Sequence, residues 1–174
     1  MESKACQESS NEQQQLDYQM AGTKKIGRTL KTALLKAQAE SRVIVGLQAA
    51  IKMLSQTPEG SLFCLMAVPQ VGDSATHMHE VLLEAFCYEN DIYVIKVDCP
   101  NKLSRILGKN SLESCCLVQK AWVRRSSSGT GTDTFSNADD DDDELLNKSE
   151  TILVDYCEAY WDSPHSPVIE LPPV

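Results

Sequence analysis

Residues 61–97 read SLFCLMAVPQVGDSATHMHEVLLEAFCYENDIYVIKV, and this stretch decides the fold. The continuous apolar run over 61–68 predicts a buried central strand, and the β-branched run over 92–97 predicts a second strand. Between them, residues 74–89 carry apolar side chains at helical spacing, which predicts a helix. A strand, a helix and a strand in succession indicate a mixed α/β fold.

Further helices and strands are predicted on both sides of this stretch. They are a helix over 26–40, a strand that turns helical at Gly46 over 43–56, a short helix over 101–108, a strand over 114–123, a helix over 145–161 and a proline-bounded strand over 166–174. The last strand suits a sheet edge, because proline donates no backbone hydrogen bond. This order of elements predicts a three-layer α/β/α sandwich.

Two segments have compositions that do not suit a packed core. Residues 1–25 are rich in Gln, Ser and Glu and predict a disordered N-terminal segment. Residues 126–138 have the Ser/Gly composition of a linker, and the acidic run Asp139–Glu144 follows directly. We therefore expect a single α/β domain over 26–172, interrupted by an acidic linker insertion at 126–144.

The predicted helix over 74–89 carries more apolar surface than one packed face requires. Its regular stripe and the two side chains that widen it are Met78, Val81, Leu82, Ala85, Phe86, Leu83 and Cys87. Together they span roughly 240°, whereas a helix on a sheet needs an arc of little more than ~100°. The surplus indicates either a neighbouring helix of the same domain or a self-association face, for which the candidates are Met78, Leu82, Leu83 and Phe86.

The residue patterns argue against an enzyme and against a metal or cofactor site. His77 and His79 lie two apart on a helix and point in different directions, and neighbouring Cys115 and Cys116 face opposite sides of a strand. The chain has no CxxC spacing, no glycine-rich phosphate loop and no nucleophile motif. We expect a protein that works by binding rather than by catalysis.

The bulk charge indicates which partners the chain favours. A net charge of −9 repels phosphate backbones, so basic protein surfaces suit it better than nucleic acid. No run approaches the ~18–20 apolar residues of a membrane helix, and the polar N-terminus lacks an apolar export stretch. The seven cysteines are then expected to be free thiols in a reducing compartment.

Four stretches together resemble the growth-arrest and DNA-damage-inducible proteins. They are HEVLLEAFCYENDIYVIKV (79–97), RVIVGLQAAIKML (42–54), LFCLMAV (62–68) and SPVIELPPV (166–174). The similarity covers about residues 26–123 and 145–172. It implies the fold of the ribosomal L7Ae/L30e/S12e superfamily, a central sheet between helices, in agreement with the order of elements above.

The resemblance also implies a non-enzymatic regulator of stress signalling and the cell cycle, in the nucleus and cytoplasm. Such proteins bind and activate a MAP kinase kinase kinase that feeds the p38 and JNK pathways, and they influence growth arrest, apoptosis and the DNA-damage response. Their other partners are a cyclin-dependent kinase, the sliding clamp (proliferating cell nuclear antigen) and a cyclin-kinase inhibitor. They self-associate partly through the helix that matches 74–89, with Leu82 as the central position.

One departure from the family concerns its acidic kinase-binding loop after the first core strand. Here that loop is PQVGD (69–73), with a single acid. We hypothesise that the acidic partner site has moved to the insertion. The candidate residues are Asp73, Asp139, Asp140, Asp141, Asp142, Asp143 and Glu144.

The alternative function is RNA binding, because L7Ae-type proteins read kink-turn RNA with an Asn-Glu pair after a glycine. The matching positions after Gly46 hold Gln48 and Ala49, and Ala49 has no group that reads a base. Lys52 remains, and the basic residues Lys24, Lys25, Arg28 and Lys31 offer only phosphate contacts. Specific RNA binding is therefore the less favoured interpretation.

Overall fold

The structure, a computed structural model, describes residues 5–69, 72, 74–121, 146–163 and 167–173. Four strands form one sheet in the order β1-β4-β2-β3. The strands are β1 (Val43–Val45), β2 (Ser61–Ala67), β3 (Tyr93–Val97) and β4 (Cys115–Gln119). β2 pairs parallel with β3 and antiparallel with β4, while β1 pairs antiparallel with β4. The expected central strand is therefore confirmed, and β3 lies at an edge of the sheet.

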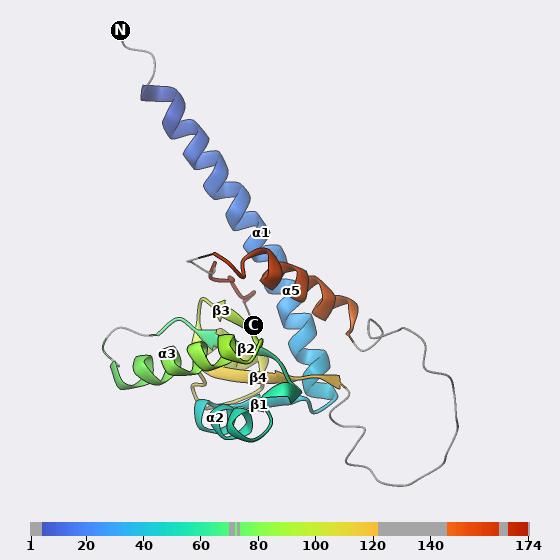
Figure 1. Cartoon of the computed structure of the whole chain (residues 1–174). Coiled ribbons are helices and arrows are strands. Elements are labelled where there is room, and N and C mark those ends of the chain that lie inside the picture. Colours follow the sequence, from blue (N-terminus) through green and yellow to red (C-terminus); the bar gives the residue numbers. More distant parts are fainter. Residues whose placement is uncertain (1–4, 70–71, 73, 122–145, 164–166, 174) are drawn as a thin grey trace.

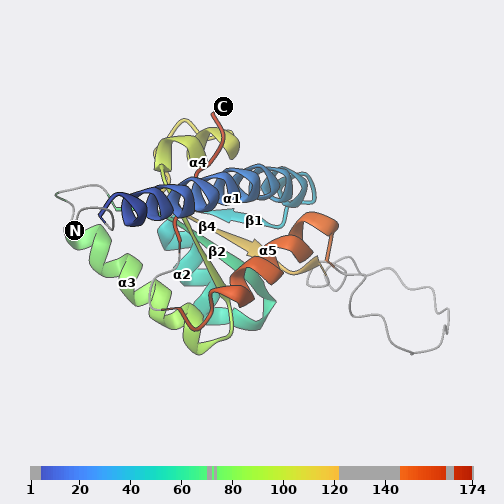
Figure 2. The same ribbon diagram turned by 90° about the horizontal axis from the view of Figure 1, so that it is seen from above.

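Helices cover both faces of the sheet (Figures 1 and 2). They are α1 (Ala5–Ala39), α2 (Leu47–Gln56), α3 (Ser74–Glu89), α4 (Pro100–Ile106) and α5 (Lys148–Ala159), with a short 3-10 helix, η1 (Pro58–Gly60), before β2. Helices α2 and α3 pack on one face, and α1, α4 and α5 pack on the other. The predicted three-layer α/β/α sandwich is thereby confirmed.

The alternation of side chains along β2 explains why the sheet has two cores. All seven residues of β2 are buried. Phe63, Leu65 and Ala67 pack toward α1, α4 and α5, whereas Cys64 and Met66 pack toward α2 and α3. Because successive side chains of a strand point to opposite faces, only a nearly continuous apolar run can fill both cores.

Helix α1 begins earlier than the sequence analysis expected. It starts at Ala5 rather than near residue 26, so it runs through most of the segment for which we predicted disorder, and its N-terminal part extends away from the sheet (Figure 1). Low hydrophobicity argues against a core but not against a helix, because Gln, Glu, Lys and Ala all have favourable helix propensities. Its C-terminal half packs on the sheet through Leu30, Ala33, Leu34 and Ala37.

The described part of the C-terminal segment, residues 167–173, does not form the strand predicted over 166–174. Its one described pairing is an isolated parallel bridge between Val97 of β3 and Ile169. Ile169 donates its N–H to the Lys96 carbonyl and accepts the N–H of Asp98, at 2.8 and 3.0 Å. The prolines at 167, 172 and 173 lack the N–H that a longer ladder needs. The segment still lies at the sheet edge, as expected.

A capping box sets the first turn of α5. The Asn147 side chain accepts the N–H groups of Ser149 and Glu150, and the Glu150 carboxylate accepts the N–H of Asn147. The insertion predicted over 126–144 lies outside the described residues. Within the described part of the chain, no helix combines the length and apolar character that crossing a membrane requires.

Candidate functional site

Helix α3 is attached to the sheet along a narrow line. Glu80, Leu83 and Cys87 are its buried residues, and they are spaced three and four apart on one side of the helix. Leu83 and Cys87 belong to the core that α3 shares with α2, β2, β3 and β4. A single line of contacts leaves most of the helix surface outside the core.

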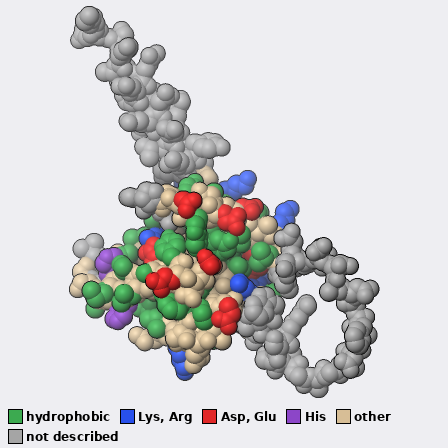
Figure 3. All heavy atoms as spheres, viewed as in Figure 1, with side chains coloured by type: hydrophobic (Ala, Val, Ile, Leu, Met, Phe, Trp, Pro, Cys, Tyr) green, Lys and Arg blue, Asp and Glu red, His purple; other side chains and the backbone are tan. Residues whose placement is uncertain are grey.

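The surplus apolar side chains of α3 face away from the sheet. Met78 is 68% exposed, Val81 49% and Leu82 62%, and Ala85 is also exposed. We call these four residues the outer face of α3. Figure 3 shows hydrophobic side chains gathered at this end of the molecule, beside two histidines. The internal neighbour that the sequence analysis allowed for does not cover this face, so it is available to a partner.

The structure corrects one residue of the predicted self-association face. Met78 and Leu82 lie on the exposed side of α3 as expected, and Phe86 is half-buried against the core. Leu83 is only 4% exposed and belongs to the core. Helical spacing gives the width of an apolar arc but not the part of it that meets the sheet, so the sequence did not separate Leu83 from the exposed side chains.

A groove between α2 and α3 continues the outer face. It has a volume of about 310 Å³. Its lining residues are Ile51, Leu54, Ser55, His79, Leu82, Leu83 and Phe86. Ile51 of α2, which is 36% exposed, was missed by the sequence analysis. Only the position of α3 shows that Ile51 borders a groove.

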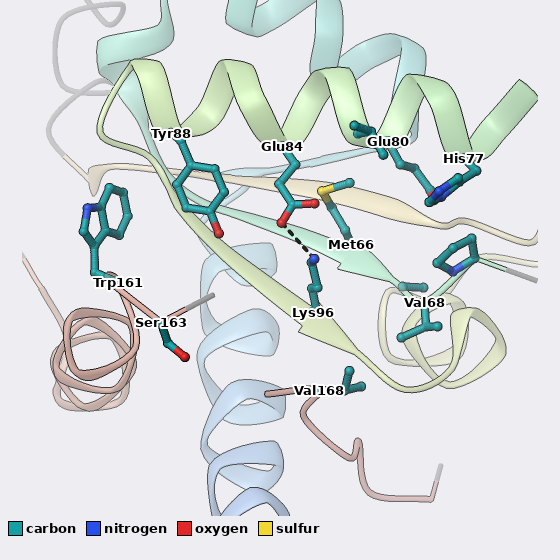
Figure 4. A pocket seen from close by; sticks show the side chains of 13 residues that line it. Met66, Val68, His77, Glu80, Glu84, Tyr88, Lys96, Trp161, Ser163 and Val168 are labelled. Carbon is teal, nitrogen blue, oxygen red and sulfur yellow. Dashed lines mark ion pairs between the residues drawn. The ribbon is translucent and has the colours of Figure 1, made fainter. Parts of the chain in front are cut away.

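A larger cleft of about 650 Å³ lies on the other side of α3, along the edge strand β3 (Figure 4). Across it, Lys96 of β3 forms an ion pair with Glu84 of α3, with 2.8 Å between Nζ and Oε1. Tyr88 and Trp161 stand edge to face at one end, with ring centroids 5.4 Å apart. The ion pair between Lys96 and Glu84 joins α3 to the edge strand, in addition to the core contacts of Leu83 and Cys87.

The predicted acidic partner residues, Asp73 and Asp139–Glu144, lie outside the described residues. The structure does describe how the two sides of the insertion are joined. Arg42, between α1 and β1, donates to the Gln119 carbonyl before the insertion and to the Glu150 carboxylate after it, each at 2.7 Å. Burial lowers the pKa of Arg42, but the hydrogen bonds that Arg42 donates to the Glu150 and Glu40 carboxylates outweigh this effect and raise the pKa. The base of the insertion is thus held by a buried ion pair.

The positions that match the L7Ae RNA site lie at the beginning of α2. Gln48 and Ala49 are exposed there. Gly46 precedes them with a φ of 102°, and a Cβ at this position would lie 3.3 Å from a carboxylate oxygen of Glu113. A carboxylate beside the helix start opposes the approach of a phosphate. This geometry adds to the missing Asn-Glu pair in disfavouring RNA.

The cysteines of the α2–α3 core form a buried cluster. The sulfurs of Cys64 and Cys115 are 4.0 Å apart. Contact with the thiols of Cys115 and Cys87, together with burial, raises the pKa of Cys64 well above its ordinary value. A thiol with a raised pKa is a poor nucleophile. Among the described residues, no group of three or more His, Cys, Asp or Glu side chains is arranged to hold a metal ion.

Sequence comparisons identify relatives of known name. Growth arrest and DNA damage-inducible protein GADD45 alpha of Homo sapiens is 35% identical over 85 residues, which are 48% of this chain and 52% of the relative. The alpha protein of Rattus norvegicus is 34% identical over 100 residues, 54% and 61% of the two chains. GADD45 gamma of Bos taurus is 34% identical over 84 residues, 47% and 53%. The match thus spans little more than half the length of these curated relatives.

A solved structure and a family model also resemble this chain. The 15.5 kD RNA binding protein of Giardia lamblia aligns with a TM-score of 0.47 and 12% identity, covering 56% of this chain and 76% of that chain. The model of the ribosomal protein L7Ae/L30e/S12e/Gadd45 family matches residues 28–122, more than half of the chain. The chain therefore belongs to this family, and the relatives named above are growth arrest and DNA damage-inducible proteins.

Proposed function

We propose that this chain is a non-enzymatic stress regulator that binds and activates a MAP kinase kinase kinase of the p38 and JNK pathways, and that it self-associates through α3. The observation that carries the proposal is the exposed outer face of α3 in a member of a growth-arrest family. Such a regulator influences cell-cycle arrest and the DNA-damage response by contact alone. Its cell-cycle partners and its place in the nucleus and cytoplasm belong to the same proposal.

Self-association is supported by the continuity of the outer face with the α2–α3 groove. In a symmetric dimer the same patch lies on both chains, so each residue of one copy meets the other patch. Met78 and Leu82 are the most exposed of the large apolar side chains of α3, and the groove beside them is lined mainly by apolar residues, with Ser55 and His79 as the polar ones. Projecting side chains next to a groove are the pattern that a self-complementary interface needs.

The decisive variant is Leu82→Glu, measured by sedimentation velocity over a range of protein concentrations. Burying a leucine contributes about 1.5–3 kcal/mol, and a dimer loses the contact twice. We expect the dimer dissociation constant to rise by at least roughly 100-fold, since ~1.4 kcal/mol corresponds to a factor of ten. The side chain is 62% exposed, so circular dichroism should show an unchanged fold.

Leu112→Glu is the matched control, because Leu112 is 56% exposed but lies in the loop before β4. It should sediment as the unaltered chain does. If Leu82→Glu and Leu112→Glu have equal dissociation constants, the outer face of α3 is not the interface. If Leu82→Glu unfolds the chain, Leu82 has a core role that its exposure does not indicate.

Kinase activation requires that the regulator prefers the active state of the kinase. A binding protein shifts a conformational equilibrium only by its difference in affinity for the two states. With a net charge of −9, this chain is suited to capture a basic inhibitory segment. Binding of this inhibitory segment by the regulator would release the kinase domain from it and so favour the active state of the kinase.

Calorimetric titration against the regulatory region of a MAP kinase kinase kinase, at two salt concentrations, tests the kinase contact. We expect binding that weakens with salt, because exposed charges are screened over about 8 Å at physiological ionic strength. Changing Asp139–Asp143 to Asn should remove most of the salt dependence. Undiminished binding by that variant would show that the insertion is not the acidic site, and absence of binding at both salts would refute the kinase contact.

A further inference from the structure

Helix α1 carries a concentration of positive charge that the proposed function does not use. Residues 22–39 contain five lysines and arginines and no aspartate or glutamate, although acidic residues outnumber basic ones by 25 to 16 in the whole chain. The five are Lys24, Lys25, Arg28, Lys31 and Lys36. Lys31 is half-buried and the other four are exposed. A local excess of positive charge in an acidic chain indicates a surface that suits an anionic partner.

Three of these side chains share one side of the helix with an exposed leucine. Lys24, Arg28, Lys31 and Leu35 follow the spacing i, i+4, i+7 and i+11, which keeps side chains on one side of a helix. We call these four residues the basic stripe of α1. Leu35 is 46% exposed, whereas the side chains that pack on the sheet belong to another side of the helix. At 1.5 Å per residue the stripe is about 16 Å long, or three helical turns.

The neighbouring elements leave the basic stripe open. Helix α1 lies beside α4 and α5 on the same face of the sheet (Figure 2). In the described part of the chain, the stripe has one ion pair, with 3.9 Å between Lys24 Nζ and Glu170 Oε2. The two side chains of that pair are 57% and 43% exposed, so the pair contributes little and can be exchanged for another.

We propose that the basic stripe of α1 binds an acidic helical segment of another protein. A helix that lies alongside α1 repeats the same 5.4 Å pitch. Its carboxylates at i, i+4 and i+7 therefore meet Lys24, Arg28 and Lys31 in register, and an apolar side chain one turn further meets Leu35. This is the helix-on-helix mode of peptide recognition, in which side chains at such spacings anchor the segment.

The described side chains favour a protein segment over nucleic acid. A protein interface buries apolar side chains among its polar contacts, so it gains from covering Leu35, whereas a phosphate backbone does not. Residues 22–39 contain no aromatic side chain on which a base could stack. The net charge of −9 also opposes a long polyanion more than a short acidic segment, because charges beyond about 8 Å are screened at physiological ionic strength.

The basic stripe and the outer face of α3 are independent surfaces. Helix α1 packs on one face of the sheet and α3 on the other. A partner on α1 therefore leaves α3 accessible, and the chain can hold two partners at once. The inference does not rest on self-association or on the kinase contact, so Leu82→Glu should leave binding at α1 unchanged.

The first test titrates the full chain with a synthetic helical peptide of about 15 residues, which spans the three turns of the stripe. The peptide carries glutamates at the stated spacing and one leucine, and amide NMR spectra follow the binding. We expect shift changes confined to α1 around residues 24–36, and weaker binding at higher salt. Arg28→Glu should raise the Kd roughly tenfold, or ~1.4 kcal/mol, because repulsion replaces attraction. Lys52→Glu is the matched control, since Lys52 is exposed on α2. Equal Kd values for the two variants overturn the proposal.

The second test separates the acidic segment from other occupants of the stripe. Leu35→Ala should weaken peptide binding several-fold without altering its salt dependence, and an unchanged Kd would remove the apolar contact from the proposal. Duplex DNA and phosphatidylserine vesicles serve as parallel probes. If either shifts the α1 amides at a lower concentration than the peptide does, the partner is not a protein segment. If changing Asp139–Asp143 to Asn shifts the α1 amides before any peptide is added, the chain's own acidic run occupies the stripe, which also overturns the proposal.

Discussion

Arg42 offers the sharpest test of the energetics, through the substitution Arg42→Met. Its side chain is 4% exposed, and the Glu150 side chain that it contacts at 2.7 Å is 1% exposed. Methionine keeps much of the aliphatic volume but removes the charge. The change leaves the Glu150 carboxylate and the Gln119 carbonyl without their shared donor.

The expected loss follows from this burial. Removing one partner of a buried ion pair costs about 3–5 kcal/mol, because the remaining charge is left desolvated. Glu150 still accepts the N–H of Asn147 at 3.0 Å, so we expect the lower end, about 3 kcal/mol. For a chain of this size, ~1 kcal/mol corresponds to about 2–4 °C in Tm, so Tm should fall by roughly 6–12 °C.

Urea unfolding followed by circular dichroism measures this loss as a lower midpoint at constant m. Lys102→Met is the control: Lys102 pairs with Asp98 at 2.6 Å, but the two side chains are 30% and 27% exposed, so at most about 1 kcal/mol is expected. The double variant Arg42→Met/Glu150→Met should lose less than the sum of the single variants. A loss below about 1 kcal/mol for Arg42→Met would refute the argument from burial.

Three further outcomes follow from particular contacts. Gly27→Ala should destabilise the chain, because the added Cβ would collide with the Glu170 carbonyl oxygen. Gly22→Ala, where a Cβ would meet nothing within 4 Å, should instead stabilise α1 by about 0.5–1 kcal/mol, and equal effects of the two variants in thermal unfolding would contradict the close approach at Gly27. The Cys64 thiol should react with a thiol reagent only on unfolding, and rapid labelling of the native chain, read by peptide mapping, would contradict its burial. Burial, and then the charge of Glu158, raise the pKa of Cys157 from 9.0 to about 12. Between these two pH values the thiol has lost its proton in the unfolded chain but keeps it in the native chain. The free energy of unfolding should therefore fall as pH rises, by about 1.4 kcal/mol per pH unit. Cys157→Ala should flatten that slope in urea titrations, and an unchanged slope would argue against this thiol as the source.

The sequence was sufficient for the four strands of the sheet and for the layers, but not for the start of α1 or for the C-terminal segment. The run over 61–68 is apolar on both faces of a strand, which only a central strand requires, and the structure places β2 between β3 and β4. The change from strand to helix at Gly46 was also predicted from the sequence, and glycine adopts the φ of 102° found there without strain. These features are local: they depend on periodicity and on the backbone freedom of single residues.

The sequence also showed that the helix over 74–89 has more apolar surface than one packed face needs, but not which part is surplus. Only the docking of α3 beside α2 decided that Leu83 is buried and Leu82 exposed, because two adjacent leucines on one helix differ by about 100° in direction and the sheet selects between them. The groove with Ile51, the pairing of Lys96 with Glu84 and the Arg42 contact across the insertion join residues distant in the chain. Local patterns carry no information on such contacts, and so the composition of a binding surface is a property of the tertiary structure.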